Sequence, residues 1–196
     1  SPLPRSGPGA VPFASPEREG LCQNLGHPEL DPFWQRLVKA DIPAVVHAVN
    51  PASNALGLGW VFANRVQWQM GQPWQMQMAI LHLIESGALD RNPDLRVGFF
   101  EGDVGWLAHW LGRLEETYDK FALLSKHHER RPIETFRQQC WISGEPADLG
   151  LRHTIDLVGQ DRLVFGSDWP HMDGAWPDPI AIVRDRDDID EGMKRA

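Results

Sequence analysis

The chain has 196 residues, of which 42% are hydrophobic and 23% are charged, with a formal net charge of −8. This length and composition are typical of one globular domain with a sizeable core, and the acidic balance argues against nucleic acid as a partner because phosphate recognition needs clustered lysine and arginine. No apolar stretch approaches the ~20 residues of a membrane-spanning helix, and two cysteines without a CxxC pattern indicate a reducing, cytoplasmic compartment.

The first 30 residues differ in composition from the rest of the chain. They begin with Ser1 rather than methionine and are rich in proline and glycine up to about Gly26. The stretch SPLPRSGPGA has neither the basic nor the apolar region of a signal peptide. We interpret residues 1–30 as a loop entered midway and residues 31–196 as the folded part.

The folded part opens with a helix and a buried strand. Asp31-Pro32 supplies an N-cap acceptor followed by proline at the first helical position. Residues 33–38 then give one apolar face, and the helix ends at 41–43. Residues 44–49 are an almost wholly apolar run, which is typical of a strand buried on both faces of a parallel sheet.

Helices and strands then continue to alternate, with a solvated basic loop at residues 126–131. Such alternation predicts an α/β fold built from right-handed βα units with a parallel sheet. The expected elements are a helix at 74–85, a strand at 95–100, a helix from about 105 to 121, a weaker strand at 136–143, a helix at 146–158 and a strand at 163–165.

Polar side chains follow the predicted strands at equivalent positions: His47, Glu101 and Asp168. Catalytic side chains of parallel sheets and barrels lie at these carboxyl ends. Each residue also has a structural interpretation, as a core histidine, an arginine-paired carboxylate and a turn cap respectively. Together, imidazole and carboxylate suit a divalent metal such as zinc, which needs at least three protein ligands where this chain offers two strong candidates.

Further residues are candidates for contact with a small-molecule substrate. Trp169 and His171 directly follow Asp168, and Trp60 lies in a segment after His47 where tryptophan alternates with glutamine and methionine. That segment either packs as a long loop or forms an aromatic wall of a pocket. No GxSxG, HExxH, GxxxxGK[ST] or GxGxxG motif occurs, so other common catalytic schemes are not supported.

Three segments carry a resemblance to a known family. They are IPAVVHAV at 42–49, the stretch 86–121 that begins SGALDRNPDL, and LVFGSDWPH at 163–171. From Ile42 to about Asp178, the chain resembles the amidohydrolase-related metal-dependent hydrolases, in the branch that contains aminocarboxymuconate-semialdehyde decarboxylase. The three segments resemble the fifth, sixth and eighth strands of that family's barrel with their surroundings.

The resemblance implies a metal-dependent hydrolase or non-oxidative decarboxylase on a (β/α)8 TIM barrel, with a divalent metal, zinc, as cofactor. His47 would be a metal ligand, and Asp168 a metal ligand and catalytic base. Glu101 stands where many members carry a catalytic histidine, which implies a changed acid–base role. Metal coordination would activate water or polarise a substrate carboxylate.

The chain departs from the family in its first-strand motif and in its length. The HxH or ExH pair of the family's first strand occurs nowhere in these residues, and a full barrel takes ~250 residues. We therefore expect roughly strands five to eight, the C-terminal half of the barrel, without a competent metal site or activity on their own. Exposed sheet edges would favour homo-oligomers.

Two alternatives remain open from the residues. One is a catalytically dead binding domain on the same fold, in which Glu101 replaces the histidine. The other is a complete small α/β domain of flavodoxin-like order, in which His47 and Asp168 are structural. The metal content of the full-length protein would distinguish the enzyme from the binding domain, and exposed apolar surface would count against the small complete domain.

Overall fold

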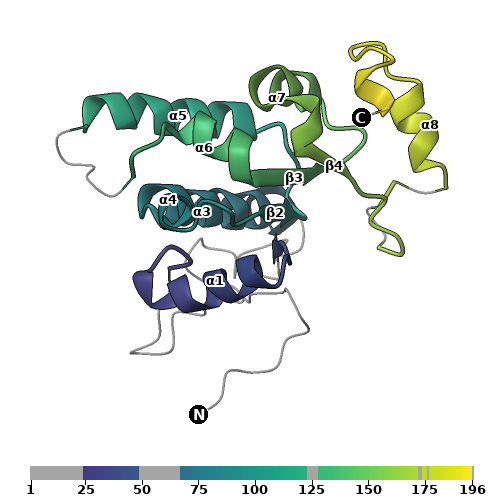
Figure 1. The fold of residues 1–196 in the computed structure, drawn as a ribbon. Helices are drawn as coiled ribbons and strands as arrows, with labels where there is room; N and C mark the ends of the chain where they lie inside the picture. The colour runs from purple at the N-terminus through teal and green to yellow at the C-terminus, as the bar shows by residue number, and fades with distance from the viewer. Residues whose placement is uncertain (1–23, 49–66, 123–127, 172–173, 176, 196) are drawn as a thin grey trace.

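Four parallel strands form one sheet at the centre of the computed structural model (Figure 1). They are β1 (Ala44–His47), β2 (Val97–Phe100), β3 (Cys140–Gly144) and β4 (Leu163–Phe165), in the order β1-β2-β3-β4. His47 lies opposite Phe100, and Ser143 lies opposite Val164. The carboxyl ends of all four strands therefore share one edge of the sheet. The structure describes residues 24–48, 67–122, 128–171, 174–175 and 177–195.

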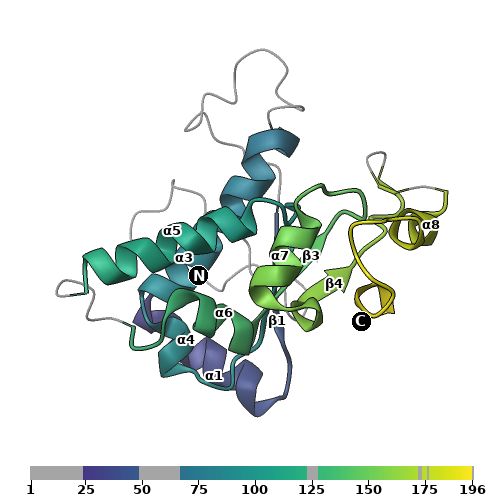
Figure 2. The same cartoon turned by 90° about the horizontal axis from the view of Figure 1, so that it is seen from above.

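Helices connect the strands and pack mainly against one face of the sheet, whereas α8 lies beyond β4 in both views (Figures 1 and 2). None of the described helices is both long and apolar enough to cross a membrane. The helical elements are η1 (Pro28–Leu30), α1 (Asp31–Lys39), the π-helix η3 (Gln67–Gly71), α3 (Gln72–Glu85), α4 (Ala88–Arg91), α5 (Leu107–Lys120), α6 (Pro132–Gln139), α7 (Leu151–Val158), η4 (Gln160–Arg162), α8 (Pro179–Arg184) and η5 (Met193–Arg195).

The core lies between the sheet and these helices. Phe99 stacks on Phe136 of α6, with 6.3 Å between ring centroids, and both side chains are fully buried. Helix α5 contributes leucines spaced four and three residues apart, the spacing of one helical face. On the other face of the sheet Val164 stays 37% exposed. The described helices thus cover one face of the sheet well, whereas the other face is partly exposed and most open at β4.

The strand order tests two expectations from the sequence. The four-stranded parallel α/β sheet is confirmed, because all three strand pairs are parallel. A flavodoxin-like sheet reverses its strand order at a switch point between two halves. The observed order has no reversal, so the flavodoxin-like alternative does not fit.

Several element boundaries predicted from the sequence are wrong. Residues 136–139 end helix α6 instead of beginning a strand, because Pro132 starts a helix whose face, including Phe136, is buried. Helix α7 begins at Leu151 rather than 146, because the Asp148 carboxylate accepts a hydrogen bond from Gly150 N at 2.6 Å and holds a turn there. Such Asx turns compete with helix.

Two polar segments also differ from expectation. Asp31 is the first residue of α1 rather than its N-cap, and its carboxylate pairs with Arg91 at 2.7 Å. In the segment expected to be a solvated basic loop, His128 is buried and Arg130 pairs with Asp90 at 2.5 Å. Residues 126 and 127 lie outside the described residues.

Candidate active site at the carboxyl edge of the sheet

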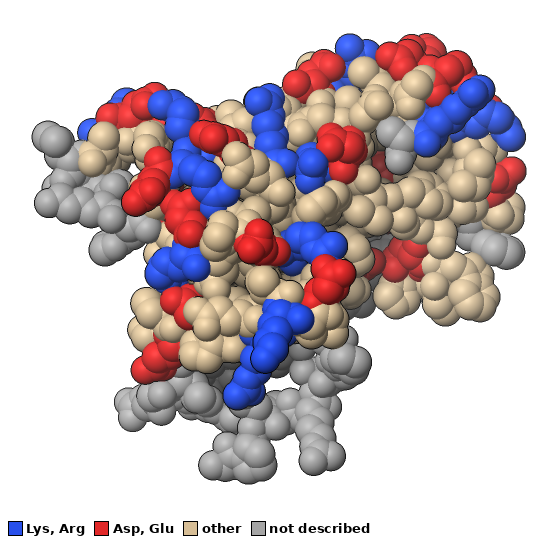
Figure 3. All heavy atoms as spheres, in the orientation of Figure 1, with Lys and Arg blue, Asp and Glu red and all other residues tan. Residues whose placement is uncertain are grey.

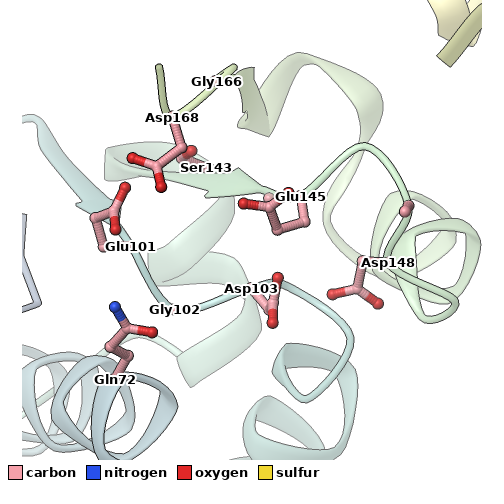
Figure 4. Close-up of a pocket in the computed structure, with 11 residues that line it drawn as sticks. Gln72, Glu101, Gly102, Asp103, Ser143, Glu145, Asp148, Gly166 and Asp168 are labelled. Carbon is pink, nitrogen blue, oxygen red and sulfur yellow. The ribbon is translucent and has the colours of Figure 1, made fainter. Parts of the chain in front are cut away.

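Glu101, Asp168 and His171 converge at the carboxyl edge of the sheet. One donor atom from each residue lies within 4.8 Å of the others. His171 Nδ1 lies 2.8 Å from Asp168 Oδ1. The Glu101 side chain, from the loop after β2, and the Asp168 side chain, from the loop after β4, face one another (Figure 4). Two carboxyl groups and an imidazole are therefore available to one bound group.

The backbone bends sharply where these side chains leave the strands. Glu101, directly after β2, has φ 65°, and Asp168, three residues after β4, has φ 52°. Both lie in the left-handed region, which non-glycine residues seldom adopt. Such strain persists only when surrounding contacts impose it, and it is concentrated at functional sites. Here it turns both carboxyl groups toward the same space.

The pKa of the Glu101 carboxyl is raised above its ordinary value. The largest cause is burial, followed by the hydrogen bond to Asp168 and the negative charge of Asp168. The positive charges of His47 and His171 act in the opposite direction but do not cancel the rise. A carboxyl group with a raised pKa can carry a proton near neutral pH, as a general acid must.

A cavity of about 410 Å³ opens beside this pair (Figure 4). Neither lysine nor arginine lines it within the part of the chain that the structure describes. Five carboxylic acids at one cavity suit a cationic occupant. Its lining consists of Gln72, Glu101, Gly102, Asp103, Ser143, Gly144, Glu145, Ala147, Asp148, Gly166 and Asp168.

His47 stands at the same edge but outside the donor group formed by Glu101, Asp168 and His171. It ends β1 with an exposed side chain, so its interpretation as a core histidine is wrong. Its Nδ1 lies 2.6 Å from the Ala48 carbonyl oxygen. This contact engages Nδ1 rather than Nε2, which is the arrangement of a metal-ligating histidine oriented by a backbone carbonyl.

The remaining candidate residues fall into two groups. Trp169 is 67% exposed and, with His171, lines a second hollow of about 310 Å³ next to Asp168. Trp60 lies outside the described residues. No salt bridge joins Glu101 to an arginine in the ranges that the structure describes, so the arginine-paired interpretation is not supported.

Sequence reasoning missed Asp148 and Gln72 at this cavity. Asp148 could have been found from the Asp-Leu-Gly pattern at 148–150, because aspartate two residues before glycine is typical of a turn. Gln72 had no such signal, since it lies in the first turn of α3 far from any predicted strand end.

Comparisons with known proteins agree with this architecture. The sequence model of a family described as amidohydrolase matches residues 6–196. A gamma-resorcylate decarboxylase of Rhizobium radiobacter is 26% identical over 151 residues, which are 73% of this chain and 44% of that protein. A 2-amino-3-carboxymuconate-6-semialdehyde decarboxylase of Dictyostelium discoideum is 25% identical over 153 residues, 76% of this chain and 40% of that protein.

Solved structures show the same fold. An amidohydrolase of Mycobacterium avium subsp. paratuberculosis superposes with a TM-score of 0.75 at 22% identity, covering 88% of this chain and 44% of that one. A dihydroxybenzoic acid decarboxylase of Polaromonas, with bound manganese and 2-nitroresorcinol, superposes with a TM-score of 0.62 at 19% identity. This match covers 90% of this chain and 53% of that one. These neighbours are TIM-barrel proteins, and the chain spans less than half the length of the curated relatives it matches.

Proposed function

The chain belongs to the amidohydrolase family, and on that premise we propose that it carries the catalytic edge of a metal-dependent, non-oxidative decarboxylase acting on a small carboxylated molecule. The observation that carries this proposal is the cluster of Glu101, Asp168 and His171, whose donor atoms lie within 4.8 Å of one another and could hold a metal ion. The curated relatives described above are decarboxylases, which favours loss of carbon dioxide over hydrolysis.

We propose further that the four strands are strands five to eight of a TIM barrel. Support comes from their sequential order, from the open face of the sheet and from the matched share of the relatives. In this arrangement the segment needs the remaining strands for activity. The apolar surface that Phe165 exposes on the edge strand β4 would favour self-association. A cytoplasmic location stays a prediction.

The residues at the edge fit a divalent metal. Asp168 with His47 would hold it, and His171 offers a further imidazole 2.8 Å from Asp168. Carboxylates suit manganese and imidazoles suit zinc, and both ions accept such a mixed set. When bound, the ion would polarise a substrate oxygen and lower the pKa of a coordinated water.

The proton chemistry follows from the contacts of the carboxyl groups. Decarboxylation breaks a C–C bond, leaves its electron pair on carbon and requires a proton at that carbon. The raised pKa of Glu101 favours its protonated form, and Asp168 touches both Glu101 and His171. Asp168 would pass the proton on, with Glu101 as its reservoir.

Trp169 and His171 would contact the substrate, together with Trp60 from outside the described residues. The exposed indole of Trp169 lies beside the hollow of about 310 Å³. An aromatic face of this kind packs well against a planar ring. The proposed substrates are therefore aromatic or similarly planar carboxylates.

The test uses the full-length protein, assayed for carbon dioxide release from a panel of hydroxylated benzoates. We expect activity that a chelator removes and manganese or zinc restores. Asp168→Asn should lower kcat by about 10³-fold or more with the fold retained by circular dichroism. The matched control is Asp156→Asn, an exposed aspartate of α7 paired with Arg152, which should keep wild-type kcat.

Two results would reject parts of this function. Turnover retained in Asp168→Asn would reject Asp168 as the proton carrier. A metal content below about one tenth of an equivalent in protein supplied with zinc or manganese would favour the catalytically dead binding domain. Hydrolysis of an amide or ester without carbon dioxide release would replace the decarboxylase by a hydrolase.

A further inference from the structure

We propose that Asp148, in the loop after β3, is a positioning residue whose carboxylate fixes the loop after β2 and thereby holds Glu101 against Asp168. This inference deepens the proposed function and rests on it only for its kinetic test. Asp148 acts through backbone contacts.

The carboxylate of Asp148 joins two loops that are far apart in the sequence. Its Oδ2 accepts hydrogen bonds from Val104 N at 2.9 Å and Gly105 N at 2.7 Å. Its Oδ1 accepts from Gly150 N at 2.6 Å. Three amides thus occupy both oxygens, so the carboxylate acts as a fixed anchor instead of a free base or ligand.

The two loops are also in direct contact at a pair of glycines. A Cβ placed on Gly150 would meet Gly105 Cα at 2.2 Å, and one placed on Gly105 would meet Asp148 Oδ1 at 2.5 Å. Thr154 of α7 adds a buried hydrogen bond from its hydroxyl to Val104 O at 2.8 Å. The loop after β2 is therefore held from one side by the loop after β3 and by α7.

Glu101 depends on this support because its loop is conformationally strained. Within three residues, Glu101 has φ 65° and Asp103 has φ 56°, and neither is glycine. Each such residue costs roughly 1 kcal/mol or more, so a free loop would relax away from this conformation. The amides of Val104 and Gly105 lie just beyond the strained residues, and fixing them fixes the turn that directs Glu101 toward Asp168 (Figure 4).

Asp148 is itself held by the C-terminal segment. Arg186, which follows α8, donates to Pro146 O and to Asp148 O, both at 2.8 Å. The same guanidinium pairs with Asp188 at 2.6 Å. The backbone of Asp148 is thus restrained on the side away from the loop that its carboxylate fixes.

The test compares two variants of the full-length protein. Asp148→Ala removes both carboxylate oxygens, so Val104 N and Gly105 N lose their shared acceptor. Gly150→Ala keeps the carboxylate but forces the loops apart, and it serves where Asp148→Ala fails to fold. We expect each variant to lower kcat by about 10- to 100-fold with KM within about threefold, the pattern of a displaced catalytic group.

A second readout does not depend on activity. Amide hydrogen exchange at Val104 and Gly105 should quicken in Asp148→Ala, and a crystal structure should show the Glu101 carboxyl displaced from Asp168. The control is Gly112→Ala on α5, where an added Cβ meets nothing within 4 Å; it should leave both readouts unchanged.

The outcomes separate the two proposals. A Glu101 carboxyl that stays against Asp168 in both variants would overturn the positioning role, whatever the activity. Wild-type kcat in both variants would overturn it equally. A displaced Glu101 in a protein whose wild type releases no carbon dioxide would support the positioning role and reject the proposed function.

Discussion

Acidic side chains have opposite electrostatic surroundings at the two edges of the sheet. At the amino edge, Asp90 pairs with Arg130 at 2.5 Å and Asp41 pairs with Arg96 at 2.5 Å. At the carboxyl edge, Glu101 faces Asp168, and the cavity beside them has no basic lining residue within the described ranges. Neighbouring groups, rather than residue type, therefore decide whether the pKa of a carboxyl group is lowered, as at Asp90, or raised, as at Glu101.

The pKa directions follow this difference. At Asp90, burial raises the pKa, but hydrogen bonds from Glu129 N and Arg130 and the charge of Arg130 together lower it below its ordinary value. At Glu101, burial and Asp168 both raise it. On the surface in Figure 3, basic and acidic side chains are interspersed over the helices, as in ordinary ion pairing. The carboxyl edge departs from that pattern.

The largest expected effect is on catalysis at the carboxyl edge. Glu101→Gln removes the proton reservoir and should lower kcat by about 10²- to 10⁴-fold in the full-length protein. Asp90→Asn, the same chemical change at the other edge, should keep kcat within about twofold of wild type. Equal losses of kcat in the two variants, measured by steady-state kinetics, would contradict the difference between the two edges.

A smaller effect is expected on stability at the amino edge. Asp90→Asn loses charged hydrogen bonds from Arg130 and Glu129 N, so the free energy of unfolding should fall by roughly 1.5–3 kcal/mol in urea titrations at pH 7. The control Asp41→Asn should cost below about 1 kcal/mol, because the Asp41 side chain is 92% exposed.

The pH dependence of that loss follows from the lowered pKa of Asp90. Its stabilisation is present above the pKa of the unfolded chain and disappears as the pH falls through the pKa of the folded state. The difference between wild type and Asp90→Asn should therefore shrink in acid. A difference that stayed constant with pH would mean that the carboxylate charge is not its cause.

The smallest expected effect has the opposite sign. Because the pKa of Glu101 is raised, its ionised form is disfavoured in the folded protein, so stability falls as the pH rises from the unfolded to the folded pKa. Glu101→Gln removes this penalty and should raise the free energy of unfolding at pH 7, measured in urea titrations, by less than about 1 kcal/mol because the group is partly exposed to solvent. The gain should vanish below the pKa of the unfolded carboxyl. A loss of stability at pH 7 would contradict the contrast between the edges.

Three of the four strands and the location of the candidate edge could be predicted from the sequence, whereas the start of the remaining strand could not. Apolar runs located β1, β2 and β4 because buried parallel strands need them. The strand predicted to begin at Phe136 was wrong there, because a short apolar stretch does not distinguish a strand from a buried turn of helix. Polar residues at strand ends predicted an edge at which the structure does bring Glu101 and Asp168 together.

The finer geometry of the edge could not be read from local patterns. The contact between Asp168 and His171 depends on the left-handed backbone at Asp168. The role of Asp148 depends on the approach of Gly105 to Gly150, two positions 45 residues apart. Contacts of this kind form only after the sheet has assembled, so neither secondary-structure propensity nor hydrophobic periodicity can predict them.

The sequential strand order has an evolutionary consequence. Each strand delivers one separate loop to the carboxyl edge, so Glu101 arrives on the loop after β2 and Asp168 on the loop after β4. Trp169 and His171 share the second loop with Asp168. The carboxylate of Asp148, which binds the loop after β2, comes from a third loop, the one after β3. Changes confined to one loop can then alter one part of this edge while the other loops keep their own side chains in place, so a lineage can vary the edge without rebuilding the sheet.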